Sequence, residues 1–517
     1  MRDEGNGNEA GGEKGMEKWL LGIDIGTSSC KVALFSPEGH VAAQGNGDYK
    51  VYYPQPGWAE QNPEDWWNAI CKAVRTMLDG SGIDPADIAG IGIDGQGWSA
   101  IAVDEGGNVL CNTPIWMDTR AHEICRELKE RIGQERIFAV CGNPLEPAYT
   151  LPKILWYKKN RPEVYSRTYK ILQSNSYIGY KLTGAMTQDI CQGYAYQCFD
   201  MRNGCWDKEA CDLLGIDMNM LPDILPCHQV IGTVSRKAAA LTGLAEGTPV
   251  VAGGLDAACG TLGAGVIHAG QTQEQGGQAG GMSICMDTYQ ADPRLILSFH
   301  VVPDMWLLQG GTVGGGGVIR WFEQEFGAAE RILAVQSGAS SLAEMDREAD
   351  SIPVGCDGMV FLPYMAGERS PIWDSKAKGV YYGIDFAKTR AHFIRASMEG
   401  VAFSLRHNLE TAKNAGADTE VLCAMGGAAN SRVWTQMKAD VTGKKIVVPS
   451  SDTATTLGAA ILAGVGTGVY SSFADAVART VAIKHEYVPD MDKYRAYQAA
   501  YNTYLSLYEN LKDIMHQ

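Results

Sequence analysis

The sequence has no hydrophobic run long enough to cross a membrane, and its N-terminal region has no pattern typical of a secreted protein. A membrane-spanning helix needs about 20 mainly apolar residues in succession, and no stretch of the chain provides them. No cationic region precedes a long apolar one, because Asp24 interrupts the first apolar stretch. We therefore expect a cytoplasmic protein with no membrane partner.

Paired cysteines are absent as well, although the chain contains 14 cysteines. No Cys-x-x-Cys pair occurs, and the nearest cluster has spacings that match no zinc-binding pattern. That cluster consists of Cys191, Cys198, Cys205 and Cys211. We expect reduced thiols rather than a disulfide framework or a zinc site.

The chain also lacks an excess of positive charge and the common nucleotide-binding motifs. Its formal net charge of −16 argues against a nucleic-acid partner, although a phosphate site needs only local positive potential. No Walker loop occurs. Gly90, Gly92 and Gly95 match the dinucleotide fingerprint, but they alternate with isoleucines and so belong inside a strand rather than in the loop after one. A nicotinamide site is therefore disfavoured.

What is present is ordinary globular composition, with 45% hydrophobic and 20% charged residues over 517 positions. Strand and helix patterns alternate, so the fold class is α/β. Residues 19–37 read as strand, glycine turn and strand, residues 64–78 as a helix, and residues 88–93 as a buried strand. Residues 1–15 are rich in Gly, Glu and Asn and predict a flexible tail.

A similar order of elements restarts midway along the chain. Residues 249–254 form an apolar strand that ends in glycines, and residues 275–285 repeat a glycine-rich bend between strands. Residues 359–362 and 421–425 give further buried strands. We interpret this as a duplication, with one domain at 16–262 and a second at 263–517.

Two segments have the composition of ligand-binding loops. In residues 22–29, Gly26, Thr27 and Ser28 offer backbone N–H groups and hydroxyls to a phosphate, while Asp24 could reach Mg²⁺ through water. A plain hairpin turn capped by Asp24 is the alternative. Asp256 follows a strand and two glycines and precedes small residues, which suggests a helix starting close under a ligand; the alternative is a helix N-cap.

Three further segments leave alternatives open. Residues 314–317 are all glycine and indicate a close backbone approach, either to a ligand or to another strand. Glu368 and Arg369 lie in a dense turn that is either a solvated surface connection or part of a site. Gly426 and Gly427 could admit a flat base, with Asn430 as a hydrogen-bond partner or an N-cap.

Two longer motifs resemble a known family. Residues 379–399 (GVYYGIDFAKTRAHFIRASME) fit the C-terminal signature of the FGGY carbohydrate kinases, in which His392 opens a helix whose apolar face packs in the core. Residues 150–160 (TLPKILWYKKN) are similar to the N-terminal signature, with Lys153 and Trp156 in place. The sequence departs from that signature at Tyr157 and, just before the quoted segment, at Ala148. The resemblance covers residues 19–469 and implies two actin-like (ribonuclease H-like) ATPase domains with a central cleft.

The resemblance also implies roles for individual residues. Asp24 matches the residue that handles the metal, and Asp256 matches the catalytic base. The residues matching the sugar-binding stretches are Gln96, Gly97, Trp98, Trp116, Asp118 and Arg120. The residues on the ATP side are Gly26, Thr27, Ser28, Gly277, Gln278, Gly280, Gly314, Gly426, Gly427 and Asn430. The second phosphate loop departs from the usual Gly-Thr-Ser-Gly, because the chain has Gly277-Gln278-Ala279-Gly280 and lacks both hydroxyls.

The activity that the resemblance implies is ATP- and Mg²⁺-dependent phosphorylation of a small sugar or polyol. D-xylulose or a related ketopentose is the preferred substrate that the resemblance implies. Residues 94–99 keep the Gly-Gln of a Ser-Gly-Gln-Met-His-Gly segment typical of xylulokinases, and residues 367–371 read Gly-Glu-Arg-Ser-Pro. Gluconate, erythritol, ribulose and the autoinducer dione remain alternatives, whereas glycerol is disfavoured. An ATPase switch of the same fold is the rival class, and a homodimer is left open. A site in which Asp256 lies across a cleft from Trp98 and Asp118 would favour the kinase.

Overall fold

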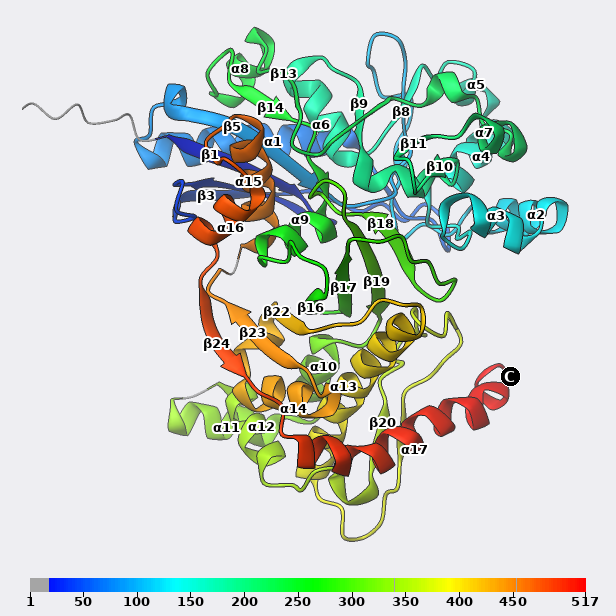
Figure 1. Cartoon of the computed structure of the whole chain (residues 1–517), viewed down its shortest axis with the longest axis vertical. Helices are drawn as coiled ribbons and strands as arrows, with labels where there is room; N and C mark the ends of the chain where they lie inside the picture. The colour runs from blue at the N-terminus through cyan, green and yellow to red at the C-terminus, as the bar shows by residue number, and fades with distance from the viewer. Residues whose placement is uncertain (1–17, 339, 452) are drawn as a thin grey trace, which may run out of the picture.

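The computed structural model describes residues 18–338, 340–451 and 453–517, so the predicted tail at 1–15 lies outside the described residues. The chain folds into two α/β halves, each built on a seven-stranded mixed sheet, which confirms the predicted fold class (Figure 1). No helix in the described ranges is long and apolar enough to cross a membrane.

The first sheet has the strand order β13-β14-β5-β1-β2-β3, with β15 also paired to β5. Its strands are β1 (Trp19–Ile25), β2 (Ser29–Phe35), β3 (Val41–Asp48), β5 (Ile88–Gly95), β13 (Val230–Thr233), β14 (Pro249–Val251) and β15 (Gly254–Leu255). The first three form an antiparallel meander, and β5 pairs with β1 in parallel. Helix α1 (Pro63–Ser81) packs on β2 and β3, so the helix and strand predicted at 64–78 and 88–93 are confirmed.

The second sheet repeats this arrangement, with the order β18-β19-β17-β16-β22-β23-β24. Its strands are β16 (Gln271–Gly276), β17 (Gly280–Met286), β18 (Ile296–Phe299), β19 (Trp306–Thr312), β22 (Val421–Met425), β23 (Lys445–Pro449) and β24 (Ile483–Tyr487). Along this sheet, β19, β17 and β16 are antiparallel, β22 and β23 follow parallel to β16, and β24 is an antiparallel edge strand. The first sheet has the same pattern when it is followed from β3 to β13. The shared order supports the predicted duplication.

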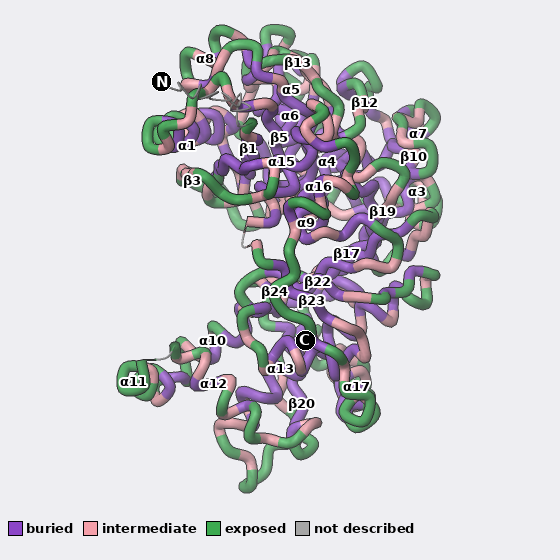
Figure 2. The backbone as a smooth tube through the Cα atoms, turned by 60° about the vertical axis from the view of Figure 1, so that its left-hand side comes forward, coloured by how far each residue is buried: buried purple, intermediate pink, exposed green. Residues whose placement is uncertain are grey.

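Helices surround both sheets. In the first half lie α2 (His122–Ile132), α3 (Gln134–Cys141), α4 (Thr150–Asn160), α6 (Ser174–Thr183), α7 (Lys208–Leu214), α8 (Arg236–Thr242) and α9 (Asp256–Gly263). Around the second sheet lie α10 (Gly316–Phe326), α11 (Ala328–Ser337), α12 (Ser341–Asp350), α13 (Arg390–Asn414), α14 (Arg432–Thr442) and α17 (Met491–Met515). Figure 2 shows buried backbone running through both halves, with α11 projecting from the lower one. The face of α13 predicted to pack in the core is buried at Ile394, Met398, Val401 and Leu405.

One C-terminal segment returns to the first half. Helix α15 (Ala454–Gly466) packs against β1, β5 and α9, and in Figure 1 it lies with α16 (Phe473–Thr480) among the elements of the upper half. Paired glycines on the two strands make room for α15. A Cβ at Gly22 would lie 2.0 Å from the Thr456 carbonyl oxygen, and a Cβ at Gly92 would lie 1.8 Å from that of Ala459. Gly92, one of the fingerprint-like glycines of β5, therefore allows a helix to pack closely on the strand. Because α15 follows residue 262 in the chain but packs in the first half, the predicted domain boundary at 262 does not divide the two halves in space.

Candidate active site

A cavity of about 380 Å³ lies between the two halves. The first half lines it with Gln96, Gly97, Trp98, Trp116, Tyr194, Leu255, Asp256 and Ala257. The second half contributes backbone and side chains of β16, β17 and β19 together with Gln278, Ala279 and Arg369. Several predicted substrate-binding residues thus face residues of the predicted second phosphate loop across one space.

Asp256 stands at the start of α9, immediately after β15. The sharp turn that presents it needs glycine, because Gly253 has a φ of +75° and a Cβ there would lie 1.8 Å from the Ile93 carbonyl oxygen. The N-cap of α9 is Leu255, so the N-cap alternative for Asp256 does not hold. Burial, with a smaller contribution from the negative charge of Asp24, raises the pKa of Asp256 to about 7. A carboxyl group that titrates near neutrality in a ligand-sized cavity suits a general base.

Asp24 lies at the end of β1 beside Asp94 of β5, its register partner. Burial raises the pKa of both carboxyls, that of Asp94 well above its ordinary value, and the neighbouring Asp24 charge adds to the effect on Asp94. Neither oxygen of Asp94 receives a hydrogen bond from a described donor. These unsatisfied carboxylate oxygens fit a hard divalent cation such as Mg²⁺. Sequence reasoning missed Asp94; the available signal was a carboxylate ending an otherwise apolar strand next to β1.

Trp98 forms one wall of the cavity in a strained backbone conformation, with a φ of +65°. Its indole Nε1 donates to the Tyr194 hydroxyl at 2.7 Å. The Nζ of fully buried Lys153 donates to the carbonyl oxygens of Trp98 and Ile115 at 2.8 and 2.7 Å, and burial lowers its pKa to about 7. The 150–160 motif therefore fixes the position of this wall.

The segment at 116–120 divides between the cavity and the core. Asp118 is fully buried, and its oxygens accept hydrogen bonds from the Arg120 guanidinium and from the backbone N–H of Ala59. Neither Asp118 nor Arg120 lines the cavity. The arrangement in which Asp118 lies across a cleft from Asp256 is therefore not observed. Trp116 does line it, and its Nε1 donates to Thr27 Oγ1 at 2.9 Å. This contact joins the loop of Gly26, Thr27 and Ser28, which does not itself line the cavity, to the cavity wall.

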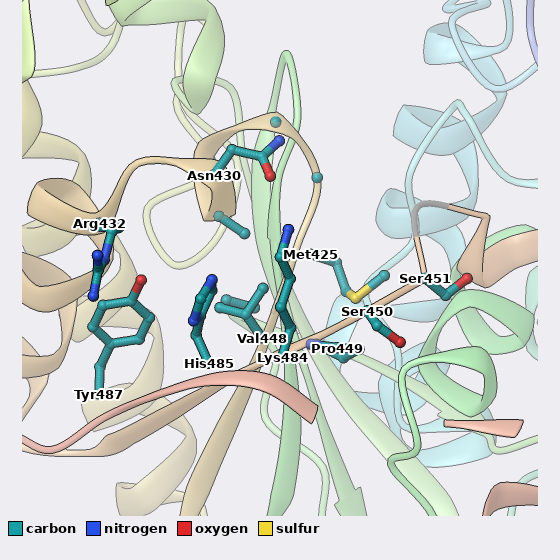
Figure 3. Close-up of a pocket in the computed structure, with 14 residues that line it drawn as sticks. Met425, Asn430, Arg432, Val448, Pro449, Ser450, Ser451, Lys484, His485 and Tyr487 are labelled. Atoms are coloured by element: carbon teal, nitrogen blue, oxygen red, sulfur yellow. The ribbon is translucent and has the colours of Figure 1, made fainter. Parts of the chain in front are cut away.

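A second cavity, of about 280 Å³, lies in the half built on the second sheet, which is the lower half in Figure 1, around the turn after β22 (Figure 3). A Cβ at Gly427 would meet no atom within 4 Å, whereas one at Gly426 would lie 2.9 Å from the Gly276 carbonyl oxygen. The N-cap of α14 is Ser431 rather than Asn430, and the exposed Asn430 lines this cavity. Opposite it, β24 presents Lys484, His485 and Tyr487, which sequence reasoning did not identify.

The predicted second phosphate loop lies between the two cavities. Gln278 and Gly280 line the central cavity, while Gly277 belongs to the backbone that Gly426 approaches from the other side. The glycine run at 314–317 approaches this loop rather than leaving an open ligand surface: a Cβ at Gly315 would lie 2.3 Å from the Ala279 carbonyl carbon. Gly314 itself is buried against Pro363 and lines neither of the two cavities.

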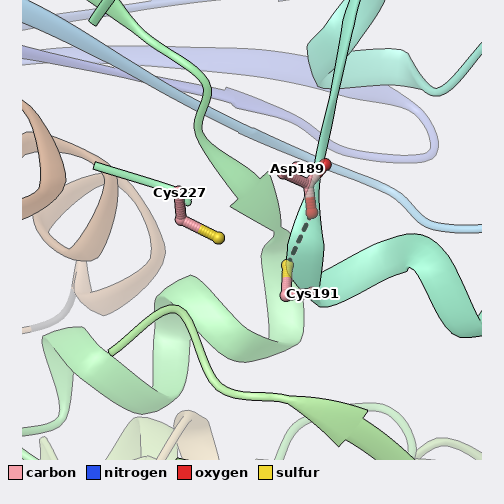
Figure 4. Close-up of side chains that lie close together, drawn as sticks. All are labelled: Asp189, Cys191 and Cys227. Carbon is pink, nitrogen blue, oxygen red and sulfur yellow. Dashed lines mark hydrogen bonds between the residues drawn. The ribbon is translucent and has the colours of Figure 1, made fainter. Parts of the chain in front are cut away.

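A buried cluster anchors the strand that leads to Asp256 (Figure 4). The ligand-type atoms of Asp189, Cys191 and Cys227 lie within 4.8 Å of one another, and the Cys191 thiol donates to Asp189 at 2.8 Å. The other Asp189 oxygen accepts three side-chain amide N–H groups, so the carboxylate is satisfied without a metal. The backbone N–H of Leu255 donates to Cys191 Sγ and that of Gly253 to the Cys227 carbonyl. All 14 cysteines are free thiols, as predicted.

The structure thus consists of two similar α/β halves with a ligand-sized cavity between them. The FGGY family of carbohydrate kinases matches this chain with its N-terminal domain over residues 19–263 and its C-terminal domain over residues 287–467, and the chain belongs to that family. A xylulose kinase of Bacillus subtilis (strain 168) is 30% identical over 499 residues, which cover 96% of this chain and 98% of that protein. A gluconokinase of Bacillus licheniformis is 30% identical over 502 residues, 96% of this chain and 97% of that protein. The crystal structure of a xylulose kinase from Rhodospirillum rubrum has a TM-score of 0.88 at 29% identity and covers 97% of this chain and 100% of that one.

Proposed function

We propose that this chain transfers the γ-phosphate of ATP to a hydroxyl of D-xylulose or a related ketopentose. The observation that carries the proposal is the position of Asp256 in a cavity whose lining residues include side chains with unpaired hydrogen-bonding atoms. Gln96 and Gln309 line this cavity, and the buried atoms Gln96 Oε1 and Gln309 Nε2 have no hydrogen-bond partner among the described residues. An acceptor and a donor left free beside aromatic walls suit a polyhydroxy ligand. The similarity to xylulose kinases supports the choice of ketopentose.

In the proposed mechanism, Asp256 accepts the proton of the attacking hydroxyl and keeps that oxygen oriented. In a loose phosphoryl-transfer transition state the proton leaves late, so orientation matters as much as basicity. The backbone N–H groups of the loops at 26–28 and 277–280 would hold phosphate oxygens. Asp24, with Asp94 behind it, would hold Mg²⁺, which neutralises phosphate charge when bound. Closing the halves excludes bulk water from the cavity and limits hydrolysis of ATP.

Gluconate is the second candidate acceptor, because a gluconokinase is as similar as the xylulose kinase and the cavity contains a cationic side chain, Arg369. An ATPase switch would have no use for a cavity lined by Asp256, Trp98 and polar amide residues. We also propose a cytoplasmic enzyme without a nucleic-acid partner, supported by the charge of −16 and the free thiols. The proposal of a homodimer is supported by the apolar face that α11 exposes at Ile332, Leu333 and Val335.

The test is a panel of acceptors at saturating ATP and Mg²⁺, with ADP release measured by a coupled assay. The panel contains D-xylulose, D-ribulose, D-gluconate, erythritol, glycerol and the autoinducer dione. We expect the highest kcat/KM with D-xylulose and little ADP release without an acceptor. Equal ADP release with and without every acceptor would favour the switch instead.

A further inference from the structure

Arg369 is the cationic side chain of the central cavity, and it has no anionic partner. Its guanidinium makes no ion pair with any described carboxylate, and its one side-chain hydrogen bond is a long one, 3.3 Å from Nη2 to the Thr312 carbonyl oxygen. The Nε atom is buried and unpaired. Burial lowers the pKa of Arg369. A guanidinium is an intrinsically strong base, so we treat the group as a cation. A partly desolvated charge without a partner is costly, so such a group suits the binding of an anionic ligand.

The neighbouring acid does not fill this role. Glu368 is 4% exposed, and its Oε1 accepts the backbone N–H groups of Val313 and Arg369 at 2.7 and 2.8 Å. Burial raises the pKa of Glu368 to about 7, and its carboxylate fixes the turn rather than the guanidinium. The reading of this turn as a solvated surface connection is therefore wrong for Glu368.

The backbone around Arg369 is arranged to admit its side chain. The backbone N–H of Ser370 donates to the Gly311 carbonyl oxygen at 3.0 Å, which ties the turn to β19. A Cβ at Gly311 would lie 3.3 Å from the guanidinium carbon, so glycine leaves the space that the side chain occupies. Gly311 pairs with Gly281 of β17, directly after the loop at 277–280. The guanidinium therefore lies beside the predicted second phosphate loop.

This position coincides with what that loop lacks. Its sequence has no hydroxyl donors, and the nearby Lys438 is neutralised by a buried ion pair of 2.6 Å with Glu274. Arg369 carries several N–H donors in a planar fork that matches two oxygens of a phosphoryl or carboxylate group. Asp256 and Arg369 are the charged side chains lining the cavity, one from each half.

We propose that Arg369 binds an oxyanion in the central cavity, and that this oxyanion is the phosphoryl group in transfer. The proposal rests on the proposed kinase function. In the transfer, the bond from the γ-phosphorus to the bridging oxygen breaks as the bond to the acceptor oxygen forms, the acceptor proton passes to Asp256, and ADP leaves with the bridging electrons. Arg369 stabilises the charge on the equatorial oxygens and so replaces the missing hydroxyls. The carboxylate of an acidic sugar offers the same chemistry and is the other source to distinguish.

The test compares Arg369→Gln and Arg369→Lys with Arg495→Gln, which removes an exposed arginine from α17 that pairs at the surface with Asp492. Calorimetric titration measures the affinities for ADP, a non-hydrolysable ATP analogue, D-gluconate and D-xylulose. We expect Arg369→Gln to weaken binding of the ATP analogue about ten-fold or more, because a charge-assisted pair is lost, and to leave ADP within about two-fold. Arg369→Lys should show a smaller loss, and Arg495→Gln no loss.

The melting temperature separates a binding role from a structural one. Because a half-buried cation without an anionic partner adds little to the stability of the fold, Arg369→Gln should melt no lower than the wild type. If gluconate binding falls instead and the ATP analogue is unaffected, the oxyanion site stands and its ligand is the acceptor carboxylate. Unchanged affinities for all four ligands would overturn the proposal, whether or not the melting temperature falls. If the wild type phosphorylates no acceptor yet Arg369→Gln still loses the ATP analogue, the proposed function fails and the oxyanion site stands.

Discussion

Replacing Asp256 with asparagine tests the assignment of the base, because asparagine has nearly the same shape but does not accept the proton. We expect Asp256→Asn to lower kcat by roughly 10²–10⁴ while ADP affinity stays within a few-fold. The variant should melt no lower than the wild type at neutral pH. The folded-state pKa of Asp256 is about 7, above the ordinary value of 3.8, so its contribution to stability is complete below pH 3.8 and is lost as the pH rises to about 7.

The pH dependence of kcat/KM tests the assignment of Asp256 as the base quantitatively. With a pKa of about 7, roughly a tenth of Asp256 is ionised near pH 6 and about a hundredth near pH 5, so kcat/KM should fall about ten-fold per pH unit on this limb. A carboxyl with its ordinary pKa would stay more than about nine-tenths ionised at pH 5 and give a flat profile. The assay is kcat/KM for the best acceptor at constant ionic strength between about pH 5 and pH 8. A flat wild-type profile, or an Asp256→Asn variant within several-fold of wild-type turnover, would refute the reasoning.

Three further outcomes follow from the site and the packing. Asp24→Ala should lower activity in a way that excess Mg²⁺ restores only in part, and full activity at ordinary Mg²⁺ would show that Asp24 only caps the turn. With the ATP analogue bound, the right acceptor should reduce the radius of gyration measured by solution X-ray scattering. Trp98→Ala should weaken both this compaction and the turnover. If only one of the two were lost, closure of the halves would not be coupled to the acceptor site. Gly92→Ala should cost about 3 kcal/mol or more and lower the melting temperature, because its Cβ would overlap the Ala459 carbonyl, whereas Gly427→Ala should weaken ATP binding at an unchanged melting temperature.

The strands and the start of helix α9 could be predicted because their signals are local. Apolar runs ending in glycine mark β1 and β14, and the alternation of Gly90 and Gly92 with isoleucines correctly placed them inside a strand. The reason for those glycines could not be read from the sequence. It depends on α15, which is more than 350 residues away in the chain and returns to the first half.

The individual site residues show the same limit. Asp118 and Arg120 have the residue types of a sugar site, but their mutual ion pair forms only in the folded core, and a two-residue spacing does not predict it. Asp94 becomes notable only when register places it beside Asp24. The sequence places Glu368 next to Arg369 and so suggests an ion pair between them. Only the structure shows that Glu368 instead accepts backbone N–H groups, which leaves the guanidinium without an ion pair among the described residues.

We propose that an acceptor hydroxyl at Asp256 meets a nucleotide whose base occupies the cavity at Gly426 and Gly427. The most direct measurement is the crystal structure of Asp256→Asn with the acceptor, Mg²⁺ and a non-hydrolysable ATP analogue. We expect adenine in the lower cavity and an acceptor oxygen about 3–3.5 Å from the γ-phosphorus, beside residue 256. Adenine bound elsewhere, or an acceptor whose hydroxyls all lie outside reach of residue 256, would contradict it.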